Sequence, residues 1–211
     1  MIVVDVLVAI LPSILYFEQI YYIIKSKENI GYSIDTSGIL LFANSTRIIF
    51  WFGEHYQINL LIQSILLILT HLLLLYVCIR YSPPAYQSRY LDFWQWNKYY
   101  VYVLSLISYN CLLIGLYFIL HRYHIFVNIL GYLALGLEAT LPIPQIIKNY
   151  QQKSLEGFKY TILLGWIAGD SFKVVYFILQ SSPLPFALCS IIQVTFDIII
   201  IIQAFLYKSK K

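Results

Sequence analysis

The chain has 211 residues, of which 60% are hydrophobic and only 11% are charged, with a formal net charge of +4. A soluble domain needs about 25% charged residues to cover its surface, so this composition excludes an ordinary soluble protein and predicts an all-α membrane protein. The scattered positive charge gives no support to nucleic-acid binding. Nucleotide-binding, metal-binding and catalytic-triad motifs are missing from the sequence, so we expect no cofactor, no metal and no enzymatic activity.

Seven apolar stretches follow one another along the chain, and each is long enough to cross a bilayer as a helix, which takes about 20 residues. Segments rich in charged residues, Gly, Pro or Ser separate them. The sequence therefore predicts seven transmembrane helices, at Ile2–Ile24, Ile34–Phe52, Ile58–Ile79, Tyr99–Leu120, Ile125–Ile147, Tyr160–Leu179 and Leu184–Leu206.

The Lys and Arg residues between these stretches predict the orientation of the helices. Eleven of them follow the first, third, fifth and seventh stretches, whereas Arg122 alone lies on the opposite side. Because positive residues concentrate on the cytoplasmic side of a membrane, we expect a cytoplasmic C-terminus and a luminal or extracellular N-terminus. Residues 208–211 then form a basic cytoplasmic tail suited to anionic lipid.

An internal duplication appears when the chain is offset by 126 residues, without any gap. We predict two three-helix repeats, residues 1–81 and 125–207, joined by residues 82–124, which hold a cytoplasmic loop and a fourth, linking helix. Three helices plus one linking helix give the two bundles the same direction, a parallel 3+1+3 arrangement. The matched pairs are Gln19 with Gln145, Lys27 with Lys153, Asn44 with Asp170, Arg47 with Lys173 and His71 with Asp197.

Ionisable side chains within the predicted helices are candidates for a substrate path, because burying them in hydrocarbon is costly. Asn44 and Arg47 lie one helical turn apart, as do Asp170 and Lys173, so each pair should share a helix face. Two interpretations stay open: a structural ion-pair cluster that joins the bundles, or a polar path near the midplane where the repeats meet. His71 also fits a packing role. The candidates are Glu18, Asn44, Arg47, His71, Glu138, Asp170, Lys173 and Asp197, together with the aromatic residue Trp166.

Pro142 and Pro144 fall in the last turns of the fifth predicted helix. Each proline removes an amide donor, so we expect a kink there, which is either a hinge or a static feature. The Gln145 side chain could bond the freed carbonyl groups. Gln19 holds the matching hinge position in the first repeat.

The segment LPIPQIIKNY at residues 141–150, followed by KSLEG at 153–157, resembles the signature of the PQ-loop repeat family. NSTRIIFWFG at 44–53, FWQW at 93–96 and WIAGDSFKVVYF at 166–177 are similar to the Golgi and endosomal lipid scramblase branch of that family. The resemblance implies an integral protein of late Golgi or endosomal membranes that translocates phospholipids without ATP.

The chain departs from the family pattern at two places. Glu18-Gln19 stands where the motif has Pro-Gln, which weakens the first hinge or moves it toward Pro12. Trp166 stands where the proton-coupled amino-acid carriers of the family have an acidic residue, and this argues against amino-acid export.

Three functions fit these features. In a scramblase, Arg47 and Lys173 would contact lipid phosphate and the acidic residues would contact amine groups. In a small-solute transporter, the same residues would enclose an amino acid or sugar at the midplane and work by alternating access. A trafficking receptor or scaffold is the third interpretation. The sequence leaves open the oligomeric state, including a homodimer.

Overall fold

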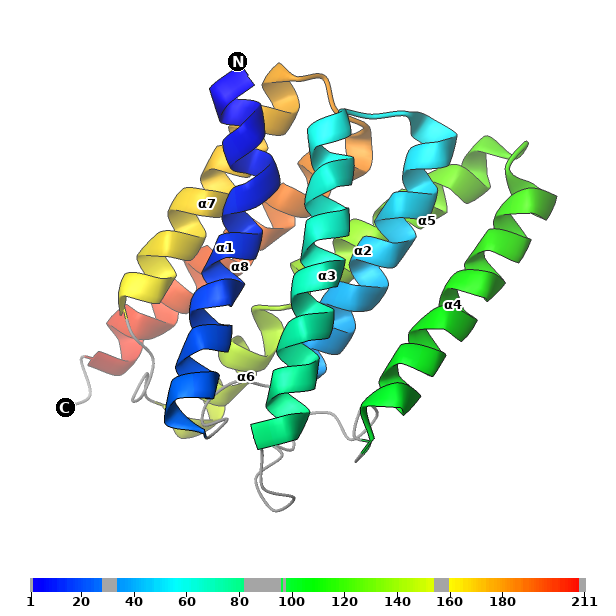
Figure 1. Cartoon of the computed structure of the whole chain (residues 1–211). Coiled ribbons are helices and arrows are strands. Elements are labelled where there is room, and N and C mark those ends of the chain that lie inside the picture. Colours follow the sequence, from blue (N-terminus) through cyan, green and yellow to red (C-terminus); the bar gives the residue numbers. More distant parts are fainter. Residues whose placement is uncertain (1, 28–33, 82–95, 97, 154–159, 209–211) are drawn as a thin grey trace. The chain divides into compact units, whose positions relative to one another are not determined.

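The computed structural model describes residues 2–27, 34–81, 96, 98–153 and 160–208 (Figure 1). Residues 82–95 and 97 of the predicted cytoplasmic loop, most of KSLEG and the end of the basic tail lie outside these residues. The described residues form eight α-helices, so the predicted all-helical class is confirmed. The helices are α1 (Ile2–Ser26), α2 (Ile34–Glu54), α3 (Ile58–Tyr81), α4 (Tyr99–Leu120), α5 (His124–Ala139), α6 (Ile143–Gln152), α7 (Tyr160–Leu179) and α8 (Leu184–Lys208).

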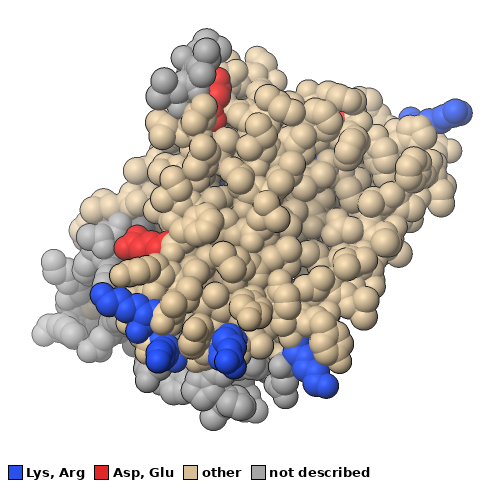
Figure 2. All heavy atoms as spheres, viewed as in Figure 1, with Lys and Arg blue, Asp and Glu red and all other residues tan. Residues whose placement is uncertain are grey.

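Among the described residues, four helices are long and apolar enough to cross a membrane, and α5 is a shorter apolar helix. The four are the greater part of α1 together with α3, α4 and α8. Large apolar side chains such as Leu104, Ile107 and Phe118 on α4 are exposed. On the face in Figure 2, most Lys and Arg side chains lie along the lower edge, and the broad area above them holds few charged side chains. These features indicate an integral membrane protein, while the count of seven spans stays a prediction.

The fifth predicted helix is two helices, which corrects the expectation of one kinked span. α5 ends at Ala139, and a short turn leads into α6 at Ile143. Pro142 is the N-cap residue of α6 and Pro144 falls in its first turn, where an amide donor is not needed. The two prolines therefore start a new helix and do not bend an old one.

The carbonyl groups around this turn are bonded locally. Leu141 N donates to Glu138 O at 3.2 Å, Ile143 N donates to Thr140 O at 3.0 Å, and the Thr140 hydroxyl donates to Leu137 O at 2.7 Å. These bonds take the place of the ones that the prolines remove. Gln145 was expected to supply a donor here, and that expectation is wrong, because its side-chain amide donates to Asn149 Oδ1 at 2.7 Å.

Helix bounds recur at the offset of 126 residues. The first residues of α7 and α8 lie 126 positions after those of α2 and α3, and the last residue of α6 lies 126 positions after that of α1. Four described residues other than glycine have a positive φ, and they form two pairs at the same offset: Lys27 (57°) with Lys153 (48°), and His55 (37°) with Ser181 (49°). Left-handed backbone is uncommon outside glycine, so its recurrence supports the predicted duplication.

The chain forms two compact units, residues 1–134 and 135–211, which divide within α5 and do not coincide with the predicted repeat limits. In the first unit, α3 packs between α1 and α2, and α4 packs against the other side of α2 (Figure 1). The start of α5 also lies against α2, since a Cβ atom at Gly131 would meet the Phe50 ring at 2.8 Å. In the second unit, α8 packs against α7 and α6.

Candidate functional site

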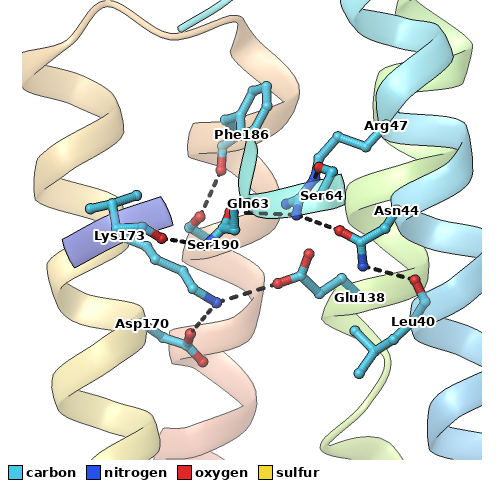
Figure 3. A network of polar contacts seen from close by, with 11 residues as sticks. Leu40, Asn44, Arg47, Gln63, Ser64, Glu138, Asp170, Lys173, Phe186 and Ser190 are labelled. Carbon is cyan, nitrogen blue, oxygen red and sulfur yellow. Dashed lines mark hydrogen bonds and ion pairs between the residues drawn. The ribbon is translucent and has the colours of Figure 1, made fainter. Parts of the chain in front are cut away.

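The first unit holds a buried polar network centred on Arg47 of α2 (Figure 3). Only 3% of the surface of Arg47 is exposed. Its guanidinium donates to Asn44 Oδ1 at 2.6 Å and, through Nε, to Ser64 Oγ of α3 at 2.7 Å. A longer bond of 3.4 Å reaches Gln63 Oε1 on the same helix. These partners are neutral oxygen atoms, which hold the cation by charge-assisted hydrogen bonds.

Gln63 extends this network to α1 and explains how that helix tolerates Pro12. Pro12 has no amide hydrogen, so the carbonyl of Val8 lacks its usual partner within the helix. The Gln63 side-chain amide donates to Val8 O at 2.9 Å and supplies the missing bond. α1 is therefore continuous from Ile2 to Ser26, including the predicted hinge position Gln19.

On its other side, α2 makes polar contacts with α4. The Thr46 hydroxyl lies 2.7 Å from the Tyr109 hydroxyl, and Asn110 Nδ2 donates to Ser45 Oγ at 3.2 Å. Asn44, Ser45, Thr46 and Arg47 are consecutive, so their side chains point in different directions around the helix. One turn of α2 thus bonds directly to α3 and α4, and it is linked to α1 through Gln63.

Tyr56, in the connection between α2 and α3, fixes the end of this turn. Its hydroxyl donates to Arg47 O at 2.7 Å, and its own carbonyl accepts a bond from Trp51 Nε1 at 2.9 Å. Burial raises the pKa of Tyr56 above its ordinary value, and this keeps the phenol protonated as a donor.

In the second unit, Lys173 of α7 occupies the position that matches Arg47 and pairs with two carboxylates (Figure 3). Its ammonium lies 3.0 Å from Asp170 Oδ1 and 3.5 Å from Glu138 Oε1 at the end of α5. The side chains of Lys173, Glu138 and Asp170 are 31%, 17% and 14% exposed, so this cluster can be reached from outside. The expected contact between Asp170 and Lys173, one turn apart, is confirmed, as is that between Asn44 and Arg47.

Asp197 of α8 completes the acidic side of this cluster. The residue is fully buried, and its carboxyl lies within hydrogen-bonding reach of the Asp170 carboxyl. The carboxyl of Asp170 and the ammonium of Lys173 both act on it electrostatically. The structure thus brings together Glu138, Asp170, Lys173 and Asp197 from three helices.

Of the remaining predicted residues, His71 and Glu18 belong to the first unit and Trp166 belongs to the second. His71 is fully buried in the first unit, with its Nδ1 atom 3.3 Å from Ser37 Oγ and its ring against Tyr16. This environment fits the packing role. Glu18 is exposed on α1, and Trp166 is partly buried on α7, one turn before Asp170.

A third set of polar contacts joins α6 to α8. Asn149 is buried and donates through Nδ2 to Gln203 Oε1 at 3.1 Å, while Gln203 Nε2 donates to Ile146 O at 3.0 Å. Together with the bond from Gln145 to Asn149, this fixes one face of α6 against α8. Lys153, which ends α6 in left-handed backbone, lies over the Tyr150 ring at 3.5 Å from its centre.

Comparison with known proteins gives two matches, one to a family model and one to a single protein. Residues 126–186 match the family model described as "PQ loop repeat". The match runs from α5 to the start of α8. The chain is also similar to a protein named Scramblase ANY1 from Saccharomyces cerevisiae, with 24% identity over an alignment that covers 90% of this chain and 67% of the yeast protein. The resemblances to the PQ loop repeat and to a scramblase are confirmed.

The residues that hold the first unit together were missed by sequence reasoning. Gln63, Ser64, Tyr109 and Asn110 are uncharged, and a search for ionisable residues passes over them. A usable signal existed for one of them: Pro12 within a helix in lipid requires a donor from a neighbouring helix, and Gln63 is a long polar side chain in an apolar stretch. In the second unit, Asn149 and Gln203 could have been noticed in the same way.

Proposed function

We propose that this protein is an ATP-independent phospholipid scramblase, an integral protein of late Golgi or endosomal membranes. The similarity to the yeast scramblase over 90% of the chain is the observation that carries this proposal. We also propose seven membrane spans in the 3+1+3 arrangement, with a luminal N-terminus and a cytoplasmic C-terminus.

The chemistry of the two networks supports this function. A charged headgroup that crosses hydrocarbon loses its hydration, and that loss is the main barrier to flip-flop. Side chains that replace the lost hydrogen bonds lower the barrier, while the acyl chains remain in lipid. Arg47 with its neutral partners, and Lys173 with Glu138 and Asp170, supply both donors and acceptors inside apolar helices. Downhill movement needs no coupling to nucleotide hydrolysis.

The two cations should act differently on a lipid phosphate. Lys173 is 31% exposed in its side chain, so it can form a charge-assisted bond without a rearrangement. Arg47 is buried and held by Asn44 and Ser64, so a phosphate would first have to displace those partners. We therefore assign the first contact with phosphate to Lys173 and mainly a structural task to Arg47.

The test is reconstitution of the purified chain in vesicles that carry acyl-labelled phospholipid, followed by dithionite bleaching of the outer leaflet. We expect bleaching to proceed beyond the half that is exposed at the start. Lys173→Met should slow the second phase about tenfold, the effect of one charge-assisted hydrogen bond. Lys98→Gln, which removes an exposed cation at the start of α4, is the matched control. No second phase in wild-type vesicles refutes the proposal.

The alternative is a small-solute transporter. One observation favours it: Asp170 and Lys173 place opposite charges 3.0 Å apart, a pair that could bind the two ends of a zwitterion such as an amino acid. Saturable uptake of a labelled amino acid that Asp170→Asn abolishes, in vesicles without lipid scrambling, would establish this alternative.

A further inference from the structure

The first unit has a group of exposed histidines at one end. His55 directly follows α2, His121 directly follows α4, and His124 is the first residue of α5. All three residues are exposed. The end of α2 and the start of α5 lie together, because a Cβ atom at Gly53 would meet the Val127 side chain at 2.6 Å. Three of the four histidines of the chain thus share one end of the first unit.

The charge of this end depends on the histidines, because histidine is the side chain that changes its charge between pH 5 and 8. Asn59 at the start of α3 donates to Asp5 at 3.4 Å, which places Asp5 at the same end. The other charged or titratable side chains of the described residues at this end are Asp5, Glu54, Tyr56, Tyr117, Arg122 and Tyr123. The two carboxylates and the guanidinium give a net charge of −1 with neutral imidazoles and of +2 with all three protonated.

Large apolar side chains surround these polar groups. Phe118, Ile119 and Ile125 are 72%, 73% and 75% exposed, and Tyr123 is 65% exposed. In an integral membrane protein, such side chains at helix ends contact lipid near the level of the headgroups. An anionic phospholipid fits this surface, since its acyl chains can pack on the apolar side chains while its phosphate meets an imidazolium or a guanidinium.

Local contacts already order two of the imidazole rings. His121 Nδ1 lies 3.1 Å from Phe118 O, which leaves Nε2 for an external partner. The His55 ring lies 5.1 Å from the Trp51 ring, measured between ring centres, and the backbone amide of His55 donates to Trp51 O at 2.8 Å. A side chain that is already ordered loses less conformational entropy when it binds a headgroup.

We propose that His55, His121 and His124, together with Arg122, form a pH-dependent binding surface for anionic phospholipid headgroups. With neutral imidazoles the surface has a net negative charge and repels these headgroups, whereas protonated imidazoles bind their phosphate groups. In the orientation and location proposed above, this end faces an acidic lumen. Anionic lipid then gathers around the first unit in the luminal leaflet as the compartment acidifies.

Quenching of Trp51 fluorescence by brominated lipid measures this contact. The purified chain is reconstituted at pH 7.5 and at pH 5.5 in vesicles with equal amounts of phosphatidylglycerol and phosphatidylcholine, only one of which carries bromine on its acyl chains. Trp51→Phe identifies the part of the fluorescence that comes from Trp51. We expect the ratio of quenching by brominated phosphatidylglycerol to quenching by brominated phosphatidylcholine to rise about fivefold at pH 5.5, the effect of one added charge near anionic lipid. The ratio cancels any direct effect of the His55 ring on Trp51.

Three variants connect the rise to the histidines. Replacing His55, His121 and His124 together by glutamine should abolish the rise, and replacing them together by arginine should give a high ratio at both pH values. Arg122→Gln is the matched control, because it removes a charge that is present at both pH values. It should lower the ratio at each pH and preserve the rise. Size-exclusion profiles at both pH values show whether each variant is folded.

A ratio that does not change with pH in the wild-type chain refutes the surface, as does a full rise in the folded glutamine variant. If the glutamine variant does not fold, a full rise in the arginine variant has the same meaning. The quenching assay needs no movement of lipid between leaflets. Its result is therefore independent of the scramblase proposal, and either one can fail without the other.

Discussion

The two units have a cation at matched positions, but the burial and the bonding partners of the two cations differ. Arg47 in the first unit is buried and bonded to the neutral oxygens of Asn44 and Ser64, whereas Lys173 in the second is partly exposed and paired with Asp170 and Glu138. A buried guanidinium with fixed partners suits a rigid joint between helices, since each donor has one geometry. An exposed ammonium among several carboxylates can exchange partners. The matched positions thus differ in environment: the cation is buried and held in one unit and partly exposed in the other.

The prolines show a parallel contrast. Pro12 lies within the continuous helix α1, and Gln63 of a neighbouring helix bonds the carbonyl that the proline leaves free. Pro142 and Pro144 stand at the start of α6, after the chain has left α5. The same residue type is accommodated by a side chain in one unit and by a break in the helix in the other.

The largest expected effect tests the contrast between the two cations. Arg47→Met should lower the free energy of unfolding by about 3 kcal/mol, because it leaves several buried acceptors without a donor. Lys173→Met should lower it by about 1 kcal/mol, because that side chain is exposed to screening. Denaturant titration in detergent, followed by tryptophan fluorescence, measures both values. Equal losses of the free energy of unfolding in the two variants would show that both cations contribute equally to stability.

The packing of α5 offers the next test. Gly131→Ala should lower the free energy of unfolding by about 1–3 kcal/mol, because its methyl group would meet the buried Phe50 ring at 2.8 Å. Gly136→Ala on the same helix meets nothing within 4 Å and should be neutral or stabilising, since alanine favours helix. The same titration compares the two variants, and a loss in Gly136→Ala of the size seen in Gly131→Ala would contradict this account.

A double-mutant cycle tests the bond between Gln63 and Val8. Gln63→Leu should lower the free energy of unfolding by about 1–2 kcal/mol, because the Val8 carbonyl loses its donor. In the Pro12→Ala background the loss should be smaller by about 1 kcal/mol, because the substituted residue has a backbone amide that can bond the Val8 carbonyl within the helix. Identical losses in both backgrounds would mean that Gln63 does not compensate for Pro12.

The smallest effect is expected in the second unit, where Gln203 joins α8 to α6. Gln203→Leu removes its bonds to Asn149 and Ile146 and should cost about 1 kcal/mol. Hydrogen exchange should become faster in α6 and remain unchanged in α1 to α3. Thr195→Val is the matched control, since the Thr195 hydroxyl bonds only within α8, to Ile191 O. Exchange in α6 that is unaffected by Gln203→Leu would contradict the assignment.

The sequence by itself determined the helical class, most helix positions and the repeat spacing. Apolar stretches of about 20 residues leave few alternatives to helices in lipid, because every backbone group must be bonded within its own segment. The same rule made Arg47, Asp170 and Lys173 recognisable as exceptions to an apolar pattern, and helical periodicity correctly placed each of them beside its partner one turn away.

Only the tertiary structure decided what surrounds these residues. Two neutral partners of Arg47, Ser64 and Gln63, come from α3, and the second carboxylate of Lys173 comes from Glu138, 35 residues away in the chain. Whether a proline bends a helix or begins another also depends on which donors are near, as Gln63 shows for Pro12. Such contacts are set by packing between helices, which periodicity along one helix does not contain.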